Sequence, residues 1–244
     1  MLHVKNVSME FYSEYDKIDV LDDISFSVKE GEIVAIIGPS GSGKTTILNL
    51  IAGLIKPTSG EIIVNGKIGY MFQRDHLFEW RTIYKNIILG LEIQKNLTEE
   101  NIEKVLRMLD IYGLWEFRNS RPSELSGGMR QRVALIRTLA TSPDLLLLDE
   151  PFAALDYQTK LIVSEDIYRI IKQEKKTTII VTHDLSEAIA MSDRIIVLSM
   201  RPAKIKKIHD IKLTIEGEKT PITARNAPEY RGYFDKLWRE LNER

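Results

Sequence analysis

The residues best suited to chemistry lie in the stretch Gly38-Pro39-Ser40-Gly41-Ser42-Gly43-Lys44-Thr45-Thr46. The apolar run before it, 33–37, is typical of a buried strand, and the run after it, 47–52, is typical of a helix. Glycines let the backbone curl so that its N–H groups point inward, and the helix adds its positive end. This G-x-x-x-x-G-K-T pattern predicts a nest for a phosphate chain, with Lys44 reaching the terminal phosphates and Thr45 holding Mg²⁺.

Two neighbouring acids, Asp149 and Glu150, end the apolar run 144–149. In a phosphate-loop fold such a strand lies beside the nucleotide. The first acid can then hold the hydration shell of Mg²⁺, and the second can orient or deprotonate the attacking water. The alternative, a strand-end turn with solvated acids, is disfavoured by the phosphate loop in the same chain.

A second anion-binding turn is predicted at Ser126-Gly127-Gly128. Ser126 is a good N-cap for the helix that follows, and the two glycines let a phosphate approach the helix start closely. The chain thus carries two phosphate sites, although one triphosphate does not obviously need both.

Composition narrows the class of protein. The 244 residues are 43 % hydrophobic and 28 % charged, with a formal net charge of −1, which does not favour nucleic acid as a partner. The absence of cysteine excludes disulfides and thiolate metal sites. No apolar run approaches the ~20 residues that span a bilayer, and the N-terminus does not resemble a signal peptide. We expect a soluble protein whose membrane role, if any, is exercised through a partner.

The N-terminal part reads as strands. Residues 2–7 and 24–28 alternate apolar and polar side chains, as half-buried strands do. Asn65-Gly66 between the short runs 61–64 and 67–72 predicts a two-residue hairpin turn. A charged loop between the first two strands is expected to contain three aromatic residues: Phe11, Tyr12 and Tyr15.

Helical periodicity replaces these strand signals from about residue 75 to residue 142. It appears at 84–93, at 102–109 after the capping stretch 98–100, and at 129–141. An all-helical insertion is therefore predicted.

Beyond residue 142, strands alternate with helices, which favours a parallel α/β sheet. The predicted strands are 144–149, 177–181 and 194–198, with a final strand or two in 204–213, and the predicted helices are 157–173 and 185–191. An apolar stripe over 230–241 predicts an amphipathic terminal helix that docks on its own domain. The fold class is α/β: a phosphate-loop NTPase core with an antiparallel β subdomain and an α-helical subdomain.

Nearly the whole chain resembles the nucleotide-binding subunit of an ATP-binding cassette (ABC) transporter. The family motifs occur here in family order: the phosphate loop 38–45, the glutamine Gln73, the signature turn 125–129, the acidic strand 145–151, the loop Ala153-Ala154-Leu155-Asp156, and the histidine His183 in Val181-Thr182-His183-Asp184. Met129 and Ala153 depart from the commonest family residues, Gln and Ser, and neither change removes a phosphate ligand.

The resemblance implies a single ABC ATPase domain over 1–244. Its parts would be a nucleotide-binding core (1–74 and 143–226), a helical subdomain carrying the signature motif (75–142) and a C-terminal amphipathic helix (227–244). It also implies a head-to-tail homodimer in which ATP lies between the phosphate loop of one copy and the signature turn of the other. Ser126, Gly127 and Gly128 would then act in trans, with Asp156 in the loop at the dimer interface.

Individual site roles follow from the same resemblance. Glu150, His183 and Gln73 are assigned to catalysis, and Thr45, Gln73 and Asp149 to Mg²⁺. An aromatic residue of the first loop would stack on adenine, and spacing favours Phe11, with Tyr12 and Tyr15 as alternates. The remaining ATP ligands are Gly38, Pro39, Ser40, Gly41, Ser42, Gly43, Lys44, Thr45 and Thr46.

The loop 77–82, L-F-E-W-R-T, and the stretch 194–202 resemble importers of the nitrate, sulfonate, taurine and pyrimidine-precursor group. This likeness implies membrane permease subunits, through them a solute-binding protein, and a peripheral location at the cytoplasmic face of the membrane. Phe78 and Trp80 would contact the permease or, alternatively, fill the core of the helical lobe.

Other interpretations stay open at this point. They are a regulatory ABC ATPase that acts on a membrane complex without solute transport, a soluble ABC ATPase, and half of an exporter. The transported solute does not touch this subunit and is not encoded in these motifs. The basic run, interpreted as a solvated strand edge, comprises Arg201, Lys204, Lys206, Lys207 and Lys212.

Overall fold

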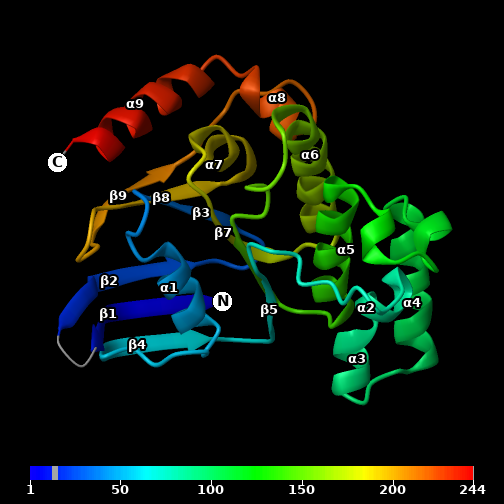
Figure 1. Ribbon diagram of the computed structural model, residues 1–244. Helices are drawn as coiled ribbons and strands as arrows, with labels where there is room; N and C mark the ends of the chain where they lie inside the picture. Colours follow the sequence, from blue (N-terminus) through cyan, green and yellow to red (C-terminus); the bar gives the residue numbers. More distant parts are fainter. Residues whose placement is uncertain (13–15, 244) are drawn as a thin grey trace.

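The computed structural model describes residues 1–12 and 16–243. Within them, the central element is a six-stranded sheet in the order β5-β6-β7-β3-β8-β9 (Figure 1). Its strands are β3 (Ile33–Ile37), β5 (Ile68–Met71), β6 (Leu145–Asp149), β7 (Thr177–Val181), β8 (Arg194–Leu198) and β9 (Ile205–Asp210). All neighbours pair in parallel except β9, which runs antiparallel to β8. Every residue of β3, β6 and β7 is buried, as expected when both faces of a parallel sheet are covered.

A second, antiparallel sheet has the order β2-β1-β4 and lies beside the central sheet (Figure 1). Its strands are β1 (Leu2–Tyr12), β2 (Lys17–Val28) and β4 (Ser59–Val64). Helix α1 (Lys44–Ile51) shares one core with both sheets, in which Leu2, Leu48 and Leu147 are fully buried. The start of α1, and with it the phosphate loop, is thereby fixed against two sheets.

The helices of 75–142 lie on the side of the molecule away from α9 (Figure 1). They are α2 (Ile83–Ile87), α3 (Leu89–Ile93), α4 (Glu99–Ile111) and α5 (Gly127–Ala140), with short 3₁₀ turns at 115–117 and 122–124. The predicted cap of α4 is confirmed, because the Thr98 hydroxyl accepts a hydrogen bond from the Asn101 N–H at 3.2 Å. Helix α6 (Tyr157–Gln173) packs on α5 and continues this core toward the central sheet.

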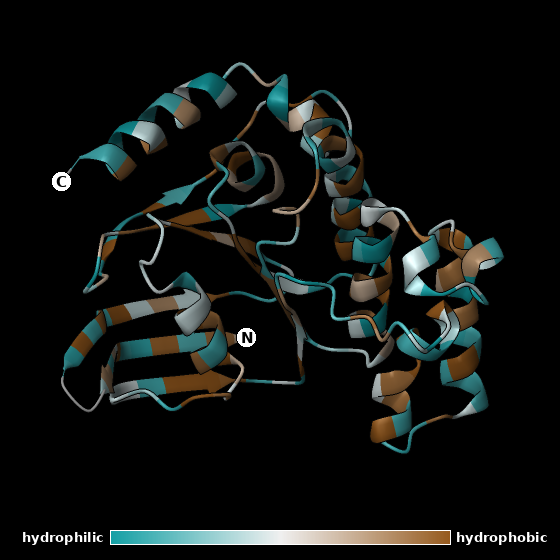
Figure 2. Cartoon of the chain, viewed as in Figure 1, coloured by the Kyte–Doolittle hydropathy of each residue, from teal (hydrophilic) through white to brown (hydrophobic). Residues whose placement is uncertain are grey.

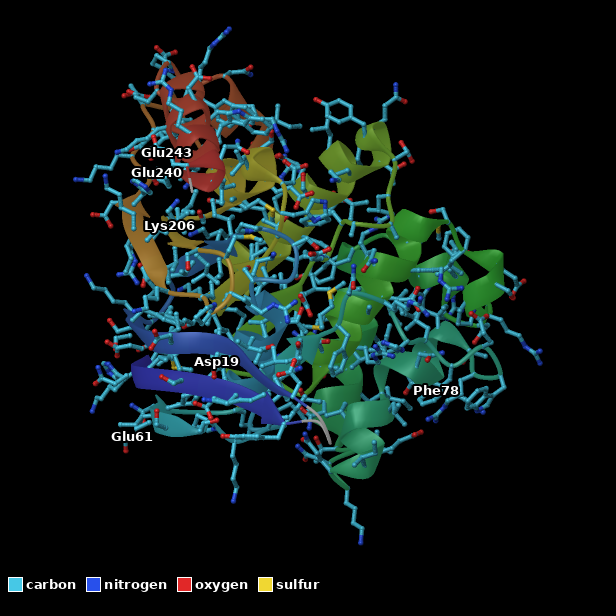
Figure 3. The ribbon with its side chains drawn as sticks, turned by 60° about the vertical axis from the view of Figure 1, so that its left-hand side comes forward. Asp19, Glu61, Phe78, Lys206, Glu240 and Glu243 are labelled. Carbon is cyan, nitrogen blue, oxygen red and sulfur yellow. The ribbon has the colours of Figure 1, made fainter. Side chains whose placement is uncertain are left out.

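The C-terminal segment covers the remaining face of the sheet through α7 (Leu185–Met191), α8 (Pro221–Arg225) and α9 (Tyr230–Asn242). Helix α9 is mostly hydrophilic in Figure 2, yet its Leu237 is fully buried in the core formed with α7 and β8. Figure 3 shows Lys206 of β9 beside the end of α9, where its Nζ donates to the backbone oxygens of Glu240 at 2.6 Å and Glu243 at 2.7 Å. Docking of the terminal helix on its own domain is confirmed.

No helix within 1–12 and 16–243 combines the length and the apolar character needed to cross a lipid bilayer.

The hairpin predicted at Asn65-Gly66 is wrong, because β4 and β5 belong to different sheets. Asn65 N–H donates to the Met1 carbonyl at 2.9 Å, and Lys67 N–H donates to Asp144 Oδ2 at 2.8 Å. These contacts turn the chain from the antiparallel sheet into the central one. There β5 pairs in parallel with β6, a partner about eighty residues later in the chain.

Smaller differences have similar causes. Phe11 and Tyr12 extend β1 instead of lying in a loop, because they pair with Ile18 and Lys17 of β2, while Tyr15 lies outside the described residues. The helical run 84–93 divides into α2 and α3. Helix α8 was not predicted, although a threonine cap and a proline at its first turn were visible signals.

The turn at Gly66, which leads the chain from the antiparallel sheet into the central sheet, generates a stability prediction. Gly66 has φ 119°, and a Cβ there would lie 2.5 Å from Asp144 Oδ2, so Gly66→Ala combines backbone strain with a steric clash. We expect it to lower the free energy of unfolding by about 2–4 kcal/mol in urea denaturation. Gly53→Ala is the matched control, because Gly53 has φ 70° with nothing within 4 Å of its Cβ position, and it should cost only about 1 kcal/mol. Equal costs for the two variants would contradict the role given to Asp144.

Candidate functional site

A cleft of about 720 Å³ opens at the edge of the central sheet where the parallel strands end. It is bordered by the ends of β1 and β2, the loop after β3, and the segments that follow β6, β7 and β8. The lining residues are Phe11, Ile18, Val20, Ser40, Gly41, Gly43, Lys44, Thr45, Thr46, Glu150, His183 and Arg201. The phosphate loop and two of the three predicted catalytic residues, Glu150 and His183, therefore meet in this cleft, whereas Gln73 is not among its lining residues.

The loop between β3 and α1 has the curl that its glycines predict. Gly41 and Gly43 have φ values of 75° and 89°, and Gly43 in the left-handed region forms the N-cap of α1. The Lys44 Nζ donates to the carbonyl oxygens of Gly38 at 2.9 Å and Pro39 at 3.0 Å. Burial lowers the pKa of Lys44, while the charges of Glu150 and Asp149 oppose this shift. The ammonium is thus held in a poorly solvated position, where attraction to an anion is strong.

Asp149 at the end of β6 reaches the phosphate loop. Its Oδ1 accepts a hydrogen bond from the Thr45 hydroxyl at 3.2 Å, and its Oδ2 lies 3.5 Å from the Tyr70 hydroxyl. Burial raises the pKa of Asp149, and the hydrogen bond from Thr45 opposes the rise. A carboxylate and a hydroxyl oxygen side by side are hard ligands of the kind that Mg²⁺ takes in phosphate sites. This donor set fits the predicted ion.

Glu150 joins three strand ends. Its Oε2 accepts a hydrogen bond of 3.1 Å from Nε2 of Gln73, a residue that follows β5. The same oxygen lies 3.3 Å from Nδ1 of His183, a residue that follows β7. Its backbone has φ 45°, a left-handed conformation that is uncommon for a non-glycine residue, and its N–H donates to the Val181 carbonyl at 2.8 Å. Such a strained backbone conformation persists only where the surrounding contacts hold it in place, and it occurs most often at functional sites.

A buried polar network anchors the segment that carries His183, and sequence reasoning missed it. The Thr182 hydroxyl donates to Glu187 Oε2 at 2.6 Å, and Lys160 Nζ lies 2.9 Å from Glu187 and 3.2 Å from Asp184. Burial raises the pKa of Glu187, and hydrogen bonds from Thr182 and Lys160 oppose that rise. The available signal was the capping pattern of α7, in which the Asp184 side chain accepts from two backbone N–H groups.

A second missed network ties the loop after Gln73 to α5. Arg130 binds Asp75 through two hydrogen bonds of 2.7 and 3.1 Å, and its Nη1 lies 2.9 Å from Glu79 Oε1. Burial favours the neutral form of Asp75, but the hydrogen bonds from Arg130 and the Leu77 N–H, together with the charges of Arg130 and Arg137, outweigh burial, so the pKa of Asp75 is lowered. Arg137 adds a hydrogen bond of 2.8 Å to the His76 carbonyl. A charged side chain in the first turn of α5 is therefore linked to the segment that positions Gln73.

The signature residues 126–128 do not line the cleft. Ser126 caps α5 as predicted, with its hydroxyl accepting from the Met129 N–H at 3.3 Å. A Cβ on Gly128 would lie 2.7 Å from Val163 Cγ2, so close packing of α5 on α6 gives this glycine a structural role as well. Asp156 also lies outside the cleft lining and caps α6 through two hydrogen bonds of 3.1 Å.

The aromatic candidates differ in position. Phe11 lines the cleft and is 41 % exposed, whereas Tyr12 is 71 % exposed and does not line it. Tyr15 lies outside the described residues. Trp80 is 73 % exposed and packs against Phe78 with ring centroids 4.7 Å apart. The alternative that Trp80 fills the core of the helical lobe is wrong.

Comparison with known proteins gives one family. The family model described as "ABC transporter" matches residues 21–153. An uncharacterised ABC transporter ATP-binding protein of Bacillus subtilis, YtlC, is 45 % identical over 99 % of this chain and 95 % of its own length. The taurine import ATP-binding protein TauB of Roseobacter denitrificans is 40 % identical over 84 % of this chain and 80 % of its own. The aliphatic sulfonates import ATP-binding protein SsuB of Bacillus cereus is 40 % identical over 86 % of each chain.

Solved structures agree with this result. The dimeric bacterial ABC transporter cassette MJ0796 superposes with a TM-score of 0.75 at 33 % identity, over 87 % of this chain and 99 % of that one. The same cassette, in a dimeric post-hydrolysis state bound to ADP and Pi, gives the same values. The chain belongs to the ABC transporter ATP-binding family. It is an ATP-binding cassette with ATPase activity, so the expected fold class and enzyme class are confirmed.

The network beneath His183 generates a second stability prediction. Lys160→Met leaves the Glu187 carboxylate, whose side chain is 3 % exposed, without its cationic partner. We expect the free energy of unfolding to fall by about 2–3 kcal/mol in chemical denaturation. Arg107→Met is the matched control, because the pair of Arg107 with Glu103 is exposed on both sides, and it should cost less than about 0.5 kcal/mol. A Lys160→Met variant as stable as the control would show that the pair does not anchor this segment.

Proposed function

We propose that this protein is the ATPase subunit of an importer for a small solute of the sulfonate, taurine, nitrate and pyrimidine-precursor group. The observation that carries the proposal is the meeting of Lys44, Glu150 and His183 in one cleft. The relatives named as taurine and aliphatic sulfonates import ATP-binding proteins support the import role and the solute group.

The phosphate loop holds the triphosphate in this proposal. The backbone of residues 38–46 and the Lys44 ammonium bind the phosphates, because a buried cation beside a helix start favours an anion. Thr45, Asp149 and Gln73 hold Mg²⁺, which when bound neutralises charge on the phosphates. The Thr45–Asp149 contact of 3.2 Å supports this assignment.

Glu150 serves as the general base in this scheme. A carboxylate at the end of β6 can accept a proton from a water that attacks the terminal phosphate. Gln73 and His183 each contact the same carboxylate oxygen, at 3.1 and 3.3 Å, and they orient Glu150 and the water. The left-handed backbone of Glu150 supports a functional role, since residues in sparsely populated backbone conformations cluster at active sites.

The second phosphate site belongs to a partner copy in this proposal. Ser126, Gly127 and Gly128 lie outside the cleft of their own chain and start a helix with a capping hydroxyl. In a two-fold dimer the same surfaces meet twice, so each signature turn faces the phosphate loop of the other copy, with Asp156 at the interface. The dimeric state of the MJ0796 cassette structures supports this arrangement.

Permease subunits would bind next to the loop that follows Gln73. The exposed Trp80, paired with Phe78 on the face seen at the right of Figure 3, offers an aromatic contact to a membrane partner. In this proposal the subunit lies at the cytoplasmic face of the membrane and is coupled, through the permease, to a solute-binding protein. Co-purification of a multi-spanning permease, with ATPase activity stimulated by a loaded binding protein, is the expected result. ATPase activity without any such partner would favour a soluble ABC ATPase instead.

The base assignment predicts the behaviour of Glu150→Gln. Removing a general base should lower ATP turnover by about 10²–10⁴-fold, while ATP binding persists and a closed dimer accumulates. Phosphate release and light scattering measure these two effects. Lys44→Ala is the contrasting variant and should lose tight ATP binding itself. Normal turnover in Glu150→Gln would refute the assignment.

The adenine contact predicts a difference between two neighbouring aromatic residues. Stacking of a base on an aromatic ring is worth about 1–3 kcal/mol, so Phe11→Ala should weaken ATP binding roughly tenfold. Tyr12→Ala is the matched control, since Tyr12 is exposed and outside the cleft, and its dissociation constant should stay within about twofold. Calorimetric titration of ATP into both variants measures these dissociation constants. A larger loss of affinity in Tyr12→Ala than in Phe11→Ala would assign the adenine contact to Tyr12.

A further inference from the structure

The turn between β8 and β9, residues 199–204, touches the phosphate loop, and the proposed function gives it no role. A Cβ placed on Gly41 would lie 2.8 Å from Arg201 Nη2, 3.7 Å from Cζ and 3.8 Å from Nε. The guanidinium of Arg201 therefore lies directly against the backbone of Gly41. Arg201 also lines the cleft together with Lys44 and Phe11.

Tertiary contacts hold this turn in place. The Ala203 N–H donates to the Val20 carbonyl and the Asp22 N–H donates to the Ala203 carbonyl, both at 2.9 Å. Across the turn, the Ser199 N–H donates to the Lys204 carbonyl at 2.9 Å. The backbone that carries Arg201 is thus pinned to β2 and closed on itself, which reduces the entropy lost when its side chain binds a ligand.

The charge of Arg201 differs from those of the three lysines that follow it in the turn and in β9, because each of them has a partner. Lys204 pairs with Asp22 at 3.0 Å, and Lys207 pairs with Glu240 at 3.7 Å. Lys206 donates to the end of α9. Among the described residues, no hydrogen bond or ion pair engages Arg201. The solvated strand edge predicted for this run describes the lysines but not a guanidinium inside the cleft.

A guanidinium has the right chemistry for this position. It is planar and always charged, and it presents its N–H donors in a fork that matches two phosphate oxygens. The ammonium of Lys44 is already bonded to two loop carbonyls, so a second cation at the loop adds charge that is free to bind. No carboxylate of the described chain neutralises it first.

We propose that Arg201 is a further nucleotide-binding residue, which contacts the phosphate chain of ATP from the β8–β9 turn. The inference rests on the proposed function only in taking ATP as the ligand of the cleft. Under this proposal, both the loop after β3 and the turn after β8 contribute to the phosphate site. The two strands β3 and β8 are parallel neighbours in the central sheet.

Direct titration tests the proposal without relying on turnover. ATP is titrated into the wild-type protein and its variants with EDTA present, so that no hydrolysis occurs. Arg201→Gln and Arg201→Met should each raise the dissociation constant about tenfold, since charge-assisted hydrogen bonds are among the stronger ones. Arg201→Lys keeps the charge without the fork and should lie between them and the wild type. Lys204→Gln, which removes the same charge from the same turn, should stay within about twofold.

Salt dependence identifies the part of the nucleotide that is contacted. An ionic contact is screened, so the advantage of the wild type over Arg201→Gln should shrink as salt is raised. An advantage that does not change with salt would mean a contact to the base or ribose and would overturn the phosphate assignment. Thermal unfolding without nucleotide should give the same midpoint for all variants, because Arg201 has no partner in the described chain to lose.

The remaining outcomes separate this inference from the proposed function. If the wild type binds ATP and Arg201→Gln binds equally well, only the role of Arg201 is overturned. An equal loss in Lys204→Gln would overturn it too, because the effect would then be one of general charge. If the wild type itself fails to bind ATP, the proposed function falls along with the inference.

Discussion

The site depends on one constraint: four neighbouring parallel strands end at the same edge of the central sheet. In the order β5, β6, β7 and β3, their ends lead to Gln73, to Glu150, to His183 and to the phosphate loop. Backbone hydrogen bonds fix the register of each strand on the next. Because β3, β6 and β7 are buried along their whole length, polar side chains can emerge only where the strands stop.

Polar anchors then set the orientation of these side chains. Lys160 and Glu187 hold the segment after β7, and Arg130 and Asp75 hold the segment after β5. A buried ion pair contributes little net stability, because desolvation offsets most of the attraction. Breaking one is costly, however, because it leaves a charge without a partner. A conformation that separates either pair is therefore disfavoured, so the pairs hold the segments after β5 and β7 and link them to helices α5 and α6.

The signature turn lies apart from the cleft of its own chain, even though it begins α5, which Arg130 connects to the Gln73 loop. Under the proposed two-fold arrangement, this connection gives a physical route between two half-sites. A displacement of Glu150 and Gln73 in one cleft would then alter the position of the start of α5, which faces the other cleft. Two distinct sites joined through one movable element are what energetic coupling requires.

Short-range patterns in the sequence determined much of this structure. The phosphate loop, the caps of α4 and α5, and the bounds of α6, β7, α7 and β8 depend on residues within a few positions of one another, so they were predictable. Only the tertiary structure decided that Asn65-Gly66 leads into a different sheet, that Phe11 belongs to a strand, and that Lys160 supports the His183 segment. The physical reason is that strand pairing and the partners of buried charges depend on contacts between residues far apart in the chain. Local periodicity in the sequence carries no information about such contacts.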